Sequence, residues 1–142
     1  MTKNFEDDGV ELKVELDIED FDGDDELYTL SFSLSGKNFK TCATYTEPWL
    51  CDKEKWIDFQ KFLRNEIVPL NNMLYLGFYG GNGDSSISCD EKEIIFNAGP
   101  SGSGGDGEVT MSLNKDVFGS ALANLLDPIF DNESLNKNWK KC

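Results

Sequence analysis

Three carboxylates at alternate positions, Asp20, Asp22 and Asp24, have the spacing of the first ligands of a calcium-binding loop. An EF-hand loop also needs glycine at its sixth position and a bidentate glutamate at its twelfth. Counted from Asp20, those positions hold Asp25 and Ser31, so the motif is incomplete. The segment fits a solvated turn better than a cation site, and we predict no bound metal.

The glycine-rich stretch at residues 102–109 matches GxGxxGxV, the string of the phosphate-covering loop of protein kinases. The other kinase motifs are missing: the sequence has no histidine for an HRD loop, no DFG and no VAIK lysine. A dinucleotide-binding fingerprint would need a helix where this sequence continues as a strand. We therefore interpret residues 99–107 as a hairpin connection and predict no cofactor.

This chain has few residues that could support nucleophilic catalysis. Because the sequence contains no histidine, catalysis by a Ser–His or Cys–His pair is excluded. Cys51 stands next to the start of an expected helix, where the helix dipole lowers a thiol pKa, but the adjacent Asp52 opposes that effect. A pair of carboxylates could still do acid–base work, yet nothing makes Asp84, Asp90 and Glu91 converge. We predict that the protein is not an enzyme.

Strands are expected in the first third of the chain. Apolar residues at 10, 12, 14, 16 and 18 alternate with charged ones, which is typical of a half-buried strand over residues 10–19. Residues 28–34 repeat this alternation, and a turn at residues 35–37 leads to a third strand over residues 38–46, with Phe39 expected to face inward. Residues 1–8 are acidic and contain no hydrophobic stretch.

Two helices and four further strands complete the expected elements. Trp56, Phe59, Leu63 and Ile67 recur at helical spacing until Pro69, and Asn114 is positioned to cap a second helix with apolar residues from 117 to 129. Strands are expected at residues 73–79, 85–89, 93–98 and 109–113. The predicted fold class is α+β in two layers, with order βββα-ββββα: one curved, mainly antiparallel sheet of about seven strands with both helices on one face.

The chain is expected to form one α+β domain over residues 1–130, followed by a polar, flexible tail over residues 131–142. Cys42, Cys51, Cys89 and Cys142 are scattered, which fits free thiols in a reducing compartment better than a disulfide framework. No secretory signal or membrane span is found. We expect a cytoplasmic or otherwise intracellular protein.

Negative charge is concentrated at the start of the chain. The formal net charge is −14, and the first 26 residues hold 12 Asp and Glu against Lys3 and Lys13. Because nucleic-acid affinity depends on Lys and Arg neutralising phosphates, direct nucleic-acid binding is not expected, and neither is membrane binding. The same field favours encounter with a basic protein, although solubility alone explains it equally well.

The candidate interaction surface combines acidic residues with two tryptophans. Trp49 lies in a proline-containing loop and is either a binding anchor or a lid over the core, while Trp139 lies among lysines in the tail. The full set is Asp17, Glu19, Asp20, Asp22, Asp24, Asp25, Glu26, Trp49 and Trp139.

The function predicted from these features is that of a non-enzymatic acidic accessory protein that binds a basic protein, for example a host or viral nucleic-acid-binding factor. The alternatives are a structural or self-associating, dimeric protein of a large DNA virus or mobile element, and an immunity-type toxin inhibitor. Small-ligand binding or hydrolase activity has the least support.

Overall fold

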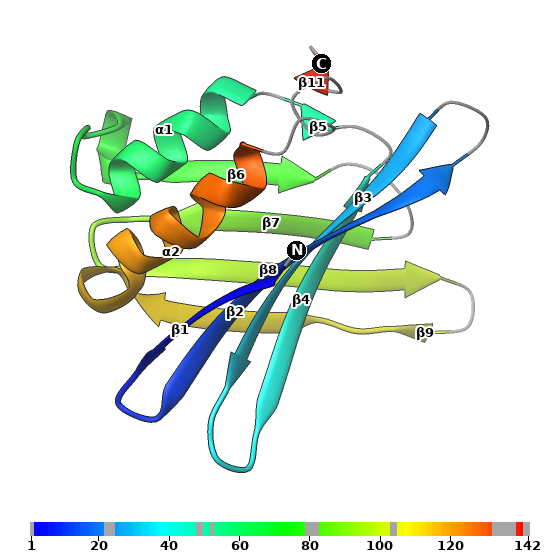
Figure 1. Cartoon of the computed structure of the whole chain (residues 1–142), viewed down its shortest axis with the longest axis horizontal. Helices are drawn as coiled ribbons and strands as arrows, with labels where there is room; N and C mark the ends of the chain where they lie inside the picture. The colour runs from blue at the N-terminus through cyan, green and yellow to red at the C-terminus, as the bar shows by residue number, and fades with distance from the viewer. Residues whose placement is uncertain are drawn as a thin grey trace.

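The computed structural model describes residues 2–21, 25–47, 50–51, 53–78, 83–102, 105–131 and 139–140. The main elements of these residues are two α-helices and two larger antiparallel sheets, which confirms the predicted α+β class (Figure 1). The order of the long elements follows the prediction, with one additional strand at the start. The predicted number of sheets was wrong: the strands before the first helix and those after it form two separate sheets instead of one curved sheet.

The first sheet consists of two consecutive hairpins in the order β1-β2-β3-β4. Its strands are β1 (Thr2–Asp7), β2 (Val10–Phe21), β3 (Asp25–Ser35) and β4 (Lys40–Glu47). Strand β1 is the additional one, and it pairs antiparallel with β2. Asp8 and Gly9 join them with φ values of 48° and 80°, and positive φ at both central residues is the condition for a type I′ turn.

Apolar and polar residues alternate along these strands, so one face of the sheet is apolar. Its buried side chains are Leu12, Val14, Leu16, Leu30, Phe32, Ala43 and Tyr45. Phe39 does not belong to this face, contrary to the prediction, because it is 80% exposed. Residues 36–39 form the connection from β3 to β4, where the Gly36 N–H donates to the Phe39 carbonyl oxygen at 2.9 Å, so Phe39 lies in a turn outside the pleated strand.

The second sheet has the order β10-β8-β7-β6, and a short strand, β9, pairs with β8. Its strands are β6 (Leu74–Phe78), β7 (Gly83–Cys89), β8 (Glu93–Gly102), β9 (Gly105–Asp106) and β10 (Val109–Asn114). The glycine-rich segment contains a hairpin as predicted, in which Gly102 pairs with Gly105, but β8 continues four residues beyond its predicted end at residue 98.

The two sheets pack face to face, and this contact is the centre of the core. The rings of Phe32 on β3 and Phe96 on β8 lie 4.7 Å apart between centroids, and both side chains are fully buried. The Tyr45 hydroxyl lies 3.0 Å from the Ser86 carbonyl oxygen and 3.2 Å from that of Asn97, so it can donate to either strand of the second sheet. Two separate sheets form because each has an apolar face that the other covers.

Both helices lie on the face of the second sheet that the first sheet also crosses (Figure 1). Helix α1 (Lys53–Leu63) buries Trp56 and Phe59, as its predicted stripe requires, and lies against β6. The helix ends before Ile67, which was expected to continue the stripe. Helix α2 (Lys115–Phe130) begins at Asn114, whose side chain accepts from the backbone N–H groups of residues 116 and 117, as predicted. At the other edge of this layer Phe118 of α2 contacts Phe5 of β1 edge-on, with centroids 5.7 Å apart.

A small two-stranded sheet pairs β5 (Leu50–Cys51) with β11 (Trp139–Lys140) in parallel. It brings part of the C-terminal segment back to the chain between β4 and α1. Among the described helices, none has the length and apolarity needed to cross a bilayer.

Candidate interaction surface

The outer face of the first sheet is polar, and its acidic residues come from β1 and β2. Glu6 on β1 lies directly opposite Glu11 on β2, so two carboxylates share one cross-strand position. Like charges placed opposite each other in a sheet destabilise it. Asp7 at the end of β1, where it lies opposite Val10, and Asp8 in the adjoining turn are exposed, and so is Asp17 farther along β2. We call these five residues, Glu6, Asp7, Asp8, Glu11 and Asp17, the acidic strip.

Lys13, the described lysine on the outer face of β2, does not neutralise the acidic strip. Lys13 lies between Glu11 and Asp17 on the outer face of β2, but its ammonium pairs with Glu15 at 3.4 Å. Among the described residues, none of the five carboxylates of the acidic strip takes part in an ion pair. The strip therefore presents uncompensated negative charge to solvent along one hairpin.

Most of the predicted acidic residues lie on the far end of the β2–β3 hairpin. Glu19 pairs with Leu27, Asp20 with Glu26, and Phe21 with Asp25. In the described registers β1 reaches only to Glu15 and β4 only to Tyr28, so these last pairs form a two-stranded ribbon beyond the four-stranded part. The structure thus brings Asp17, Glu19, Asp20, Asp25 and Glu26 onto one hairpin, whereas Asp22 and Asp24 lie outside the described residues.

One of the two predicted tryptophans is placed through the small sheet. Trp139 pairs with Leu50 in the parallel β5–β11 ladder. Trp49 itself lies outside the described residues. Trp139 therefore belongs to a different sheet from the acidic strip on β1 and β2.

The buried Lys115 ammonium and the buried Cys89 thiol are the candidates for a catalytic pair. The Lys115 side chain is only 4% exposed; its Nζ donates to Asn65 Oδ1 and lies 4.7 Å from the centroid of the Phe62 ring. Burial raises the pKa of the Cys89 thiol to about 12, although the charge of Lys115 acts in the opposite direction. The thiol is therefore protonated at neutral pH and is not an activated nucleophile.

The buried position of Lys115 is explained by the way α1 ends. Asn65 has a φ of 60° and follows the end of α1, where the N–H groups of residues 65 and 66 donate back to the carbonyls of residues 62 and 61. This is the Schellman arrangement that ends many helices. The Lys115 ammonium thus lies at the negative end of the α1 dipole, where a cation is favoured.

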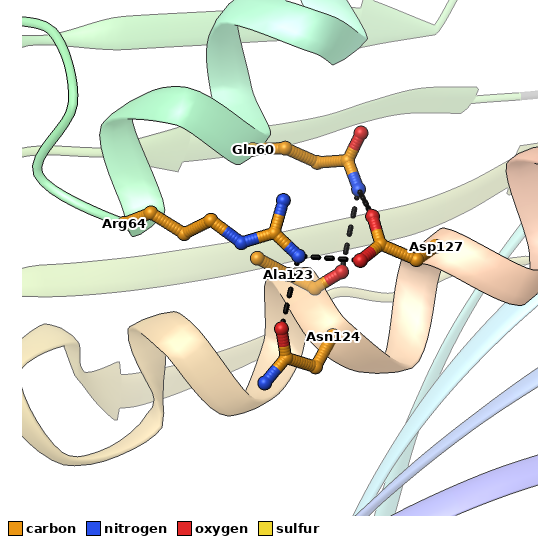
Figure 2. Close-up of polar contacts among 5 residues, drawn as sticks. All are labelled: Gln60, Arg64, Ala123, Asn124 and Asp127. Carbon is orange, nitrogen blue, oxygen red and sulfur yellow. Dashed lines mark hydrogen bonds and ion pairs between the residues drawn. The ribbon is translucent and has the colours of Figure 1, made fainter.

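A second polar cluster joins the two helices and is shown in Figure 2. Gln60 on α1 donates from Nε2 to Asp127 Oδ1 at 2.7 Å and to the Ala123 carbonyl oxygen at 3.3 Å. Arg64 donates to the other oxygen of Asp127 and to Asn124 Oδ1. Because one Asp127 oxygen accepts from Gln60 of α1 and the other from Arg64 just after α1, this cluster holds the helices together and leaves no carboxylate oxygen of Asp127 unpartnered.

Metal ligation finds no support in the described part of the chain, where no three Cys, Asp or Glu side chains gather as a metal site would require. Asp22 and Asp24 are outside that part, so the prediction about the aspartate-rich turn stays a prediction.

Two features of the surface were not found from the sequence. The Glu6–Glu11 pair was missed because β1 was missed, and the Asp8-Gly9 dipeptide was the signal that could have revealed the hairpin. A set of exposed apolar residues between α1 and β6 was also missed. Its signal is the absence of any charged residue from residue 67 to residue 83.

Comparison of this chain with protein-family models, with curated proteins and with solved structures gave no match.

Proposed function

We propose that this protein acts without catalysis, by docking a basic protein on the outer face of its first sheet. The observation that carries the proposal is the opposed Glu6–Glu11 pair, to which the exposed Asp7 and Asp8 add at the same end of the sheet. This arrangement costs folding stability, since opposed like charges repel. A basic partner would remove the cost, because its cations would lie between the carboxylates.

Electrostatics would contribute mainly to the rate of association and to the choice of partner. A protein with a formal net charge of −14 attracts cationic surfaces over distances comparable to the Debye length, about 8–10 Å at physiological salt. Such steering raises association rates and excludes acidic competitors. Nucleic-acid-binding proteins and basic toxins are the classes of partner with a suitable surface.

The test uses proteins recovered on the immobilised chain at low salt, with association rates measured for Glu11→Lys and Glu91→Lys. Both substitutions change the net charge equally, but Glu91 lies in the β7–β8 turn of the second sheet. We expect Glu11→Lys to slow association several-fold and Glu91→Lys to change it little. Complexes with the unmodified chain should weaken steeply between about 50 and 500 mM salt.

Slower association of Glu11→Lys would not be explained by misfolding of this variant. Glu11→Lys replaces a repulsive cross-strand pair with an attractive one, so the variant should be at least as stable as the unmodified chain. The proposal fails if Glu11→Lys binds as fast as the unmodified chain, or if the recovered proteins are not basic.

A further inference from the structure

We draw no further inference here: the strongest candidate, the exposed Phe39 side chain in the β3–β4 turn beside the β1–β2 turn of the acidic strip, carries nothing because Lys37 and Lys40 stand next to it in the same turn and nothing in the described part of the chain shows what covers it.

Discussion

Burial controls the chemistry of individual side chains in this protein, and the cysteines show it most clearly. Cys89 is 1% exposed on the inner face of β7, whereas Cys42 on β4 is exposed. The Cys89 pKa is raised to about 12 because burial disfavours the thiolate. Neither the low reactivity of Cys89 nor its raised pKa is visible in the sequence.

We predict an alkaline loss of stability that depends on Cys89. A folded-state pKa above the unfolded value of about 9 gives a contribution that is complete below pH 9 and falls as pH rises toward 12. The free energy of unfolding, measured by urea titration across this range, should fall less steeply in Cys89→Ala than in the unmodified chain. Cys42→Ala serves as the control and should keep the original slope; an unchanged slope in Cys89→Ala would refute the prediction.

At the scale of elements, the junction between the two helices depends on one glycine. A Cβ atom added to Gly119 of α2 would lie 2.8 Å from the Leu63 carbonyl oxygen at the end of α1. That approach is closer than real Cβ contacts allow, and the obstacle is backbone that cannot rotate away. The hydrogen bonds of Gln60 and Arg64 to α2 hold the same junction (Figure 2).

Gly119→Ala should therefore destabilise the protein, although alanine is a better helix former than glycine by about 1 kcal/mol. Overpacking at such a contact costs about 1–3 kcal/mol. Ser120→Ala, at an exposed position of the same helix, is the matched control and should be neutral or slightly stabilising. Urea denaturation measures both variants, and a Gly119→Ala protein as stable as Ser120→Ala would show that the helices can separate without cost.

At the scale of the whole molecule, the two sheets are held by ring packing and by one buried hydroxyl. Tyr45 of β4 reaches across the interface to backbone carbonyls of β7 and β8, and its pKa is raised because burial disfavours the phenolate. This contact joins residues far apart in sequence. It fixes how the first sheet, with its acidic strip, lies on the second.

Replacing Tyr45 by Phe should lower the free energy of unfolding by about 1 kcal/mol, the usual net value of such a hydrogen bond. Tyr75→Phe removes the same atom from a side chain that is 56% exposed, so it should leave stability unchanged. Equal stability of the two variants in urea titration would mean that the sheets are held by apolar packing alone.

The sequence predicted local structure well wherever periodicity was strong. The alternation from Val10 to Ile18 specified β2, the stripe containing Trp56 specified α1, and Asn114 was correctly identified as a cap. Strand β1 was not predicted because Phe5 is its only large apolar residue. Val117 was expected on the apolar face of α2, yet it is 42% exposed, because its position at the edge of that face lies outside the contact with the sheets.

By itself, the sequence determined the fold class, the order of the long elements and the concentration of acid at the start of the chain, because these depend on neighbouring residues. Only the tertiary structure decided that the strands divide into two facing sheets and that Leu70 stays in solvent. Each of these outcomes depends on which distant surfaces cover one another. Local hydrophobic periodicity identifies a surface that must be buried, but it does not identify the surface that buries it.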